Sequence, residues 1–233
     1  MSSRLQRVRR LLADPEHAEQ GFELGLQVRG TQGLLRYEVA RGVVRLKGAP
    51  LDYGRLRWAC HTGDPRIVRL EAVAYWGTTV LDGPPWTGLE CLERLPGLRE
   101  LELYRCGPVD LSRLALRYVM VESEHPPRLP EGPSTVFLTG LGQARALPWL
   151  PSSTQVFGLR GGTRIVDCSS LEGLPIELLY LTGLMEQRDW SFLRTLPALR
   201  MLSLERCSLV RRGDLPEGVE VRALGAMGAV LDL

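Results

Sequence analysis

The chain has 233 residues, of which 44% are apolar and 24% charged, a globular composition that excludes a disordered or collagen-like chain. Its 29 basic residues nearly balance its 27 acidic ones, which argues against a dedicated nucleic-acid binder. No run approaches 18 apolar residues, so neither a membrane-spanning helix nor a secretory signal is expected. Leucine occurs 43 times, roughly twice its average usage.

Residues 1–66 are expected to form an N-terminal helical cap. Apolar residues at helical spacing follow Ser3 as far as Leu12, and Asp14-Pro15 then supplies the cap and first-turn proline of a second helix. The apolar face of this second helix would comprise Ala18, Phe22 and Leu26, with Gly30 at its end. Beyond Gly33 the signals are mixed, with a strand expected at 43–46 and a helix at 51–60.

An internal repeat dominates the remainder, residues 67–233. The segment from Leu92 to Cys106 returns 101 residues later as the segment from Leu193 to Cys207, with nine of fifteen positions identical. A second pair of similar segments is 136–141 and 179–184, both of which contain Leu-Thr-Gly-Leu. Both pairs follow the frame L-x-x-L-x-L, in which two apolar residues share one face of a short strand.

This frame resembles the leucine-rich repeat of bacterial proteins. Frames start at Leu70, Leu98, Leu116, Pro133, Thr154, Ile176, Leu199 and Val219, which gives seven to eight irregular repeats. The resemblance implies an α/β solenoid in one continuous domain, with a parallel β-sheet on a concave face and short helical or irregular segments on the convex side. Solenoids need covered ends, which is the role expected of the N-terminal cap.

The third, fifth and seventh positions of each frame would point out of the concave face. Five of these positions are aromatic, and four carry Glu against one Arg, so the face is predicted to be acidic and aromatic. The predicted partner-binding residues are Trp76, Glu100, Glu102, Tyr104, Tyr118, Met120, Glu122, Phe137, Arg160, Tyr180 and Glu205. The same frame points Ala72 and Ala74 outward in the first repeat, and Val221, Ala223 and Gly225 in the last.

No catalytic or cofactor motif is present in the sequence. There is no H-E-x-x-H, no G-x-S-x-G and no Walker A loop, and Gly161-Gly162-Thr163 is interpreted as a turn. An enzyme is therefore not expected, and no cofactor or metal is predicted. Five cysteines without a C-x-x-C pair favour reduced, structural thiols in a cytoplasmic protein. These cysteines are Cys60, Cys91, Cys106, Cys168 and Cys207.

The leading functional hypothesis is a non-catalytic module that binds a partner protein on the concave face. Aromatic anchors on an open sheet favour protein binding, and the acidic face favours a partner with a basic rim over a nucleic acid or a membrane. A more specific alternative is an immunity or antitoxin protein that neutralises a cognate bacterial toxin. The alternative from another class is a nucleic-acid binder, or an enzyme with an unrecognised site.

Overall fold

The computed structural model describes residues 22–28, 31–38, 43–48, 69–73, 89–224 and 230–231. The chain divides into two compact units. Unit 1 comprises residues 1–109 and 113–116, and unit 2 comprises residues 110–112 and 117–233. Among the described residues, no helix has the length and apolarity needed to cross a bilayer.

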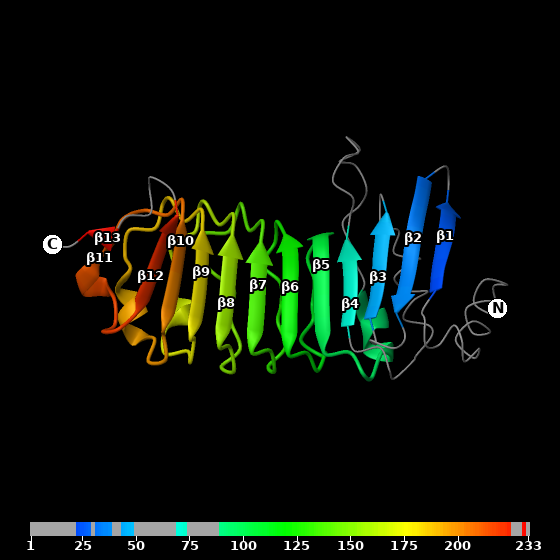
Figure 1. The fold of residues 1–233 in the computed structure, drawn as a ribbon, viewed down its shortest axis with the longest axis horizontal. Coiled ribbons are helices and arrows are strands. Elements are labelled where there is room, and N and C mark those ends of the chain that lie inside the picture. Colours follow the sequence, from blue (N-terminus) through cyan, green and yellow to red (C-terminus); the bar gives the residue numbers. More distant parts are fainter. Residues whose placement is uncertain are drawn as a thin grey trace. The chain divides into compact units, whose positions relative to one another are not determined.

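Unit 1 contains an antiparallel meander that continues into parallel strands (Figure 1). In chain order its elements are β1 (Phe22–Val28), β2 (Thr31–Glu38), β3 (Val43–Gly48), β4 (Arg69–Val73), the 3₁₀ helix η2 (Leu89–Arg94) and β5 (Glu100–Cys106). Strands β1 to β3 pair antiparallel, whereas β3, β4 and β5 pair in parallel. In the register, Leu35 pairs with Leu46, and Val44 pairs with Leu70, which pairs in turn with Leu101.

The predicted second helix of the cap is wrong over Phe22–Val28, which forms β1. Phe22 and Leu26 are spaced for a helix, but Leu24 and Val28 complete an alternation with a period of two, which is the pattern of a strand. Pairing with β2 extends along the whole length of β1. The strand predicted at 43–46 is confirmed within β3. The helices predicted at 3–12 and 51–60 lie outside the described residues.

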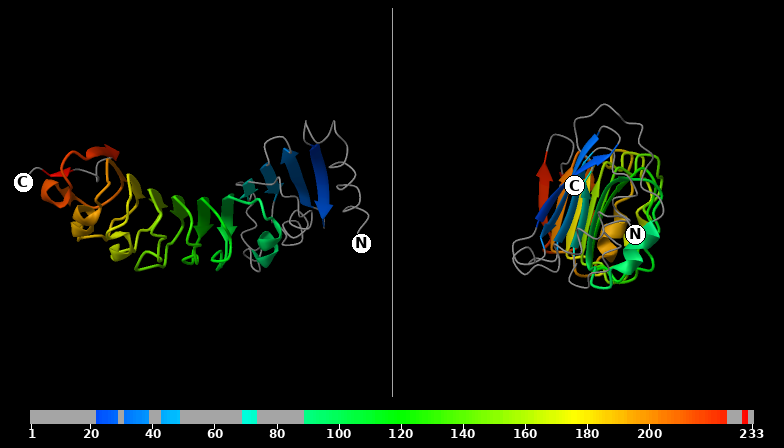
Figure 2. Two further views of the ribbon diagram at one scale, coloured as in Figure 1. Left: turned by 90° about the horizontal axis from the view of Figure 1, so that it is seen from below. Right: turned by 90° about the vertical axis from the view of Figure 1, so that its right-hand side faces the viewer.

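Unit 2 is a parallel β-solenoid. Its sheet runs in the order β6 (Tyr118–Ser123), β7 (Thr135–Thr139), β8 (Val156–Arg160), β9 (Leu178–Thr182), β10 (Met201–Glu205) and β12 (Glu220–Leu224). Among the described residues of unit 2, the connections contain the short helices η3 (Ser169–Leu171), η4 (Ser191–Thr195) and η5 (Arg212–Asp214), and the two-residue strands β11 (Val210–Arg211) and β13 (Val230–Leu231). The strands line one side of unit 2, and η3 and η4 lie on the other side (Figure 2).

The core of unit 2 lies between the sheet and these connections. Alternate strand residues are buried and half-buried, as period-two patterning requires. The buried strand residues are Val119, Val121, Val136, Leu138, Phe157, Leu159, Leu179, Leu181, Leu202 and Leu204. Opposite them, the connections contribute Leu111, Leu129, Leu147, Cys168, Trp190 and Val210, all buried. Each such side chain contributes about 1.5–3 kcal/mol through its removal from water.

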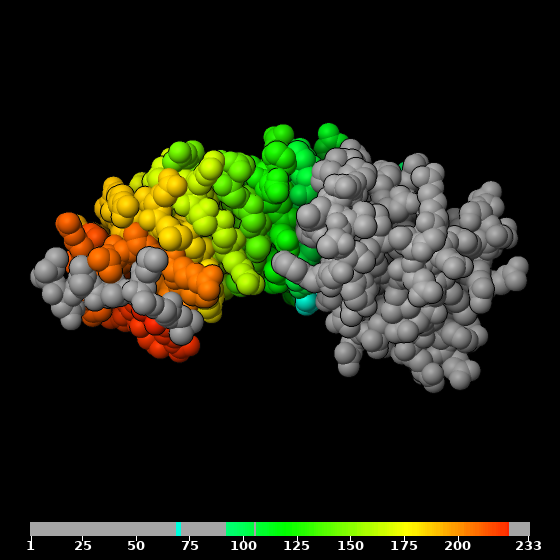
Figure 3. Space-filling view, turned by 90° about the horizontal axis from the view of Figure 1, so that it is seen from above, coloured from blue at the N-terminus to red at the C-terminus, as the bar shows by residue number. Residues whose placement is uncertain are grey.

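A left-handed residue follows each of four consecutive strands. Gly140, Gly161 and Gly183 have φ of 85°, 85° and 87°, and Arg206 has φ of 51°. The Gly183 amide donates to the Glu205 carbonyl on the next strand, and the two preceding glycines make the equivalent bonds. The repeated Thr-Gly of the sequence is therefore the turn that ends β7 and β9, and Arg160-Gly161 and Glu205-Arg206 take the same place after β8 and β10. The ends of these strands lie at the edge seen in Figure 3. Gly161, which was predicted to lie in a turn, lies in one.

Candidate functional site

The sheet of unit 2 has an outward face, opposite the buried leucines, that is formed by alternate residues of β6 to β10. The sequence frame placed these residues in the same register that the structure shows. From β6 to β10 they are Tyr118, Met120, Glu122, Thr135, Phe137, Thr139, Val156, Gly158, Arg160, Leu178, Tyr180, Thr182, Met201, Ser203 and Glu205. This set includes seven of the predicted binding residues.

The frame was wrong on β4, where the first repeat was expected. Leu70 pairs with Leu101 and Ala72 with Leu103, so Ala72 occupies a core register and does not belong to the outward face. Ala74 and Trp76 lie outside the described residues. The outward register position next to Glu100 is instead held by Arg69, which the frame had missed.

The frame was also wrong on β12, by one residue. Val221 pairs with Leu202 and Ala223 with Leu204, so both take the register of core positions. Glu220 and Arg222 occupy the outward positions in their place, and their side chains form an ion pair of 2.8 Å. Gly225 lies outside the described residues.

Three aromatic rings meet at the centre of the outward face of unit 2. The centroid of the Phe137 ring lies 6.2 Å from that of Tyr118 and 6.2 Å from that of Tyr180. These distances and the tilted orientations are those of stabilising aromatic pairs. Gly158 lies between Phe137 and Tyr180 in the register, and a Cβ atom there would fall 2.2 Å from Phe137 Cδ1. The Phe137 ring therefore covers the backbone of β8 at a position that only glycine leaves open.

Apolar side chains extend this cluster across neighbouring strands. Val156, Leu178 and Met201 lie side by side in the register of β8, β9 and β10, and all three are half-buried. Together with the rings and Met120 they form a continuous set that we call the aromatic patch. It comprises Tyr118, Met120, Phe137, Val156, Leu178, Tyr180 and Met201.

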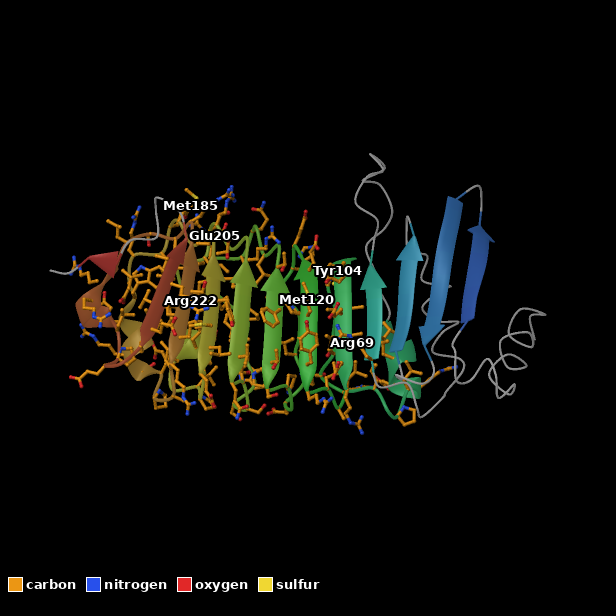
Figure 4. All side chains as sticks on the ribbon, viewed as in Figure 1. Arg69, Tyr104, Met120, Met185, Glu205 and Arg222 are labelled. Atoms are coloured by element: carbon orange, nitrogen blue, oxygen red, sulfur yellow. The ribbon has the colours of Figure 1, made fainter. Side chains whose placement is uncertain are left out.

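A row of polar residues borders the aromatic patch at the end of each strand. The register aligns Glu122, Thr139, Arg160, Thr182 and Glu205 across β6 to β10, and we call this set the polar row. Figure 4 shows Glu205 near the end of β10 and Met120 further back along β6. The outward face of unit 2 thus presents an apolar area with charges along one side.

The predicted residues of unit 1 form an ion-paired cluster on β4 and β5. Arg69 approaches Glu100 at 3.3 Å and Glu102 at 2.5 Å, and the Tyr104 hydroxyl donates to Glu102 at 3.3 Å. Glu102 is only 8% exposed. Figure 4 labels Arg69 and Tyr104. The single positive charge of Arg69 offsets one of the two negative charges of Glu100 and Glu102, so this cluster keeps a net negative charge.

The cysteines of unit 2 are buried thiols. Burial raises the pKa of Cys168 from 9.0 to about 12, and the charge of Asp167 acts in the same direction. Burial also raises the pKa of Cys207, whose Sγ donates to the Leu181 carbonyl at 3.3 Å. Protonated, buried thiols are poor nucleophiles and poor metal ligands. The described part of the chain holds no group of three or more His, Cys, Asp or Glu side chains suited to a metal ion.

The aromatic patch and polar row are therefore the features of unit 2 that lend themselves to recognition of another molecule. In comparisons with known proteins, no family model, no characterised protein and no solved structure matches this chain. The functional argument rests on the chemistry of these side chains.

Proposed function

We propose that the chain is a non-catalytic protein-binding module of the leucine-rich-repeat type, and that the outward face of unit 2 binds its partner protein. The observation that carries this proposal is the aromatic patch. A sheet face that meets only solvent is normally lined by polar side chains. Here it carries the ring of Phe137 in contact with the rings of Tyr118 and Tyr180, together with aliphatic neighbours, all half-buried.

Aromatic side chains in contact with one another are effective anchors for a protein partner. Tyr and Trp dominate the binding energy of protein interfaces, and a central apolar area with a polar rim is the usual anatomy of such interfaces. The patch and the polar row have this arrangement. Pre-packing by ring contacts also lowers the entropy cost of ordering the side chains on binding. The buried, reduced thiols support a cytoplasmic location as part of the same proposal.

Site-specific photo-crosslinking in the native cell tests the location of the interface. A photo-reactive phenylalanine replaces Thr182, on the outward face, or Trp149, which is 53% exposed and lies outside the strands. We expect a covalent partner adduct from position 182 and none from position 149. Adducts formed equally at both positions would contradict the proposal.

Alanine substitutions then measure the contribution of the patch. Truncation of an interface anchor costs about 2 kcal/mol or more, or roughly 30-fold in affinity. We expect Phe137→Ala and Tyr180→Ala each to weaken binding of the crosslinked partner by at least about 30-fold, and Trp149→Ala to leave it unchanged. Urea unfolding of each variant separates lost contacts from lost folding. Undiminished binding by folded Phe137→Ala and Tyr180→Ala would refute the proposal.

A further inference from the structure

Two opposite charges lie in the polar row beside the aromatic patch. Arg160 at the end of β8 and Glu205 at the end of β10 are both aligned with Thr182 on the strand between them. Two strand spacings separate their backbones by about 9.6 Å. Arg160 is exposed and Glu205 is half-buried. Neither side chain has an ion pair with another side chain in the described part of the chain.

Some charges at exposed positions of unit 2 are already paired within the protein. Arg145 pairs with Glu186 at 2.9 Å, and Arg222 pairs with Glu220 at 2.8 Å. In contrast, the strand that carries Thr182 holds Arg160 and Glu205 apart. Each is therefore able to receive a group of opposite charge from a second molecule without first breaking an ion pair of the protein.

On the basis of the proposed function, we propose that the partner is a polypeptide segment with an acidic side chain that pairs with Arg160 and a basic side chain that pairs with Glu205. Apolar residues of the same segment lie on the rings of Phe137 and Tyr180. Guanidinium–carboxylate pairing suits Arg160, because its planar group binds carboxylates in a bidentate manner. Complementary charges of this kind set orientation and specificity, and the aromatic patch supplies the binding energy.

The backbone separation of about 9.6 Å between Arg160 and Glu205 restricts the partner sequence. In a polyproline II helix, side chains three residues apart project from the same side and lie about 9.3 Å apart. In an α-helix, side chains seven residues apart share a face and lie about 10.5 Å apart. In a β-strand, residues on the same side lie about 6.6 Å or about 13 Å apart, and both distances differ more from the separation of about 9.6 Å. The partner's acidic and basic residues are therefore expected to be three or seven positions apart.

A displayed library of random sixteen-residue peptides provides the test. The full chain selects peptides from this library in parallel with the polarity-swapped variant Arg160→Glu/Glu205→Arg, which has the same net charge. A matched control, Glu220→Arg/Arg222→Glu, reverses the paired charges on β12. We expect the native chain and the control to enrich one order of acidic and basic residues at spacing three or seven. The polarity-swapped variant should enrich the opposite order.

Affinities of the selected peptides provide a second measurement. A peptide selected by the native chain should bind the polarity-swapped variant at least about tenfold more weakly, since both attractions become repulsions. Enrichment of the same charge order by both proteins would overturn the inference. If both proteins enriched the same charge order but Phe137→Ala abolished peptide selection, the proposal that the outward face of unit 2 binds protein would still hold. If no peptide were enriched by the native chain, both the inference and the proposed function would fail.

Discussion

Gly158 offers the sharpest test of how the aromatic patch is built. An alanine Cβ at this position would lie 2.2 Å from Phe137 Cδ1 and 2.4 Å from Cε1, so the ring has to move. Because the ring is half-buried on an open face, it moves outward and loses its contacts with Tyr118 and Tyr180. Each such ring pair contributes about 0.5–1.5 kcal/mol, so the loss is about 1–3 kcal/mol.

The same substitution also has a stabilising effect, which opposes this loss of unfolding free energy. Glycine within a strand costs about 0.5–1 kcal/mol relative to alanine, and the backbone of Gly158 is not left-handed. The net expectation for Gly158→Ala is a loss of about 0–2.5 kcal/mol of unfolding free energy. In the Phe137→Ala background the clash is absent, and Gly158→Ala should instead stabilise by about 0.5–1 kcal/mol. The sign of the effect therefore depends on the residue at position 137.

Urea unfolding of the four proteins in this cycle measures the coupling. Trp190, which is 2% exposed, reports loss of the core through its fluorescence. The coupling free energy between positions 137 and 158 should be about 1–3 kcal/mol. An equal destabilisation by Gly158→Ala in both backgrounds would refute the reasoning, because it would show that the backbone of β8, and not the Phe137 ring, requires glycine.

Further predictions concern the turns and the titratable groups. Arg206→Gly should raise the unfolding free energy, measured in urea, by about 0.5–1 kcal/mol, because the left-handed conformation costs a non-glycine residue about 1–2 kcal/mol and this exceeds the entropy cost of glycine. Gly183→Ala should lower the unfolding free energy, because it places a non-glycine residue in the same conformation. Cys168 should not react with Ellman's reagent at pH 8 until urea unfolds the chain. Because the pKa of Cys168 is raised in the folded state, its contribution to stability should fall as pH rises from 9.0 to about 12. The Ser191 hydroxyl and amide donate to Asp189 and lower its pKa, so stability due to Asp189 is present above pH 3.8 and lost as pH falls through the folded pKa. In acid titrations followed by fluorescence, Asp189→Asn should remove that part of the pH dependence.

The parallel strands of unit 2 were predictable because the alternating apolar residues in the sequence are the residues that each strand buries on one side. Paired apolar residues such as Val136 and Leu138, or Leu179 and Leu181, must lie on one side of a strand, and repetition stacks each pair on the next. The outward residues then follow by alternation, which is why Phe137 and Tyr180 were placed correctly. The orientation of the Phe137 ring over Gly158 was not predictable from spacing, since spacing carries no information about side-chain rotamers.

One local signal was present in the sequence but missed. Asp-x-Ser occurs at 110–112, 167–169 and 189–191. In each case the carboxylate accepts a hydrogen bond of 2.9 Å from the backbone amide two residues later. This is the Asx turn, in which an aspartate replaces a backbone acceptor. The residue between Asp and Ser is buried each time, so the motif marks where the connection begins to pack beneath the sheet.

The frame failed on β4 and β12, the first and last strands to which it was applied. β12 is the last strand of the sheet, and terminal repeats of a solenoid depart from the consensus, whereas β4 lies between β3 and β5 and pairs in parallel with both. On β4 the frame took Leu70 as a first leucine, whereas its pairing with Leu101 makes it the second. On β12 the pairing of Val221 with Leu202 shifts the register by one residue.

These shifts replace apolar residues with charged ones at the outward register positions of β4 and β12. Arg69 and Arg222 take outward register positions, and each forms ion pairs with glutamates of the same side of its sheet. The same shifts also place Glu71 and Glu220 at outward register positions, so two added glutamates match the two added arginines and the predicted excess of Glu over Arg remains. The aromatic residues of the patch come from β6 to β9, where the frame was correct. The proposed protein binding therefore does not depend on β4 or β12.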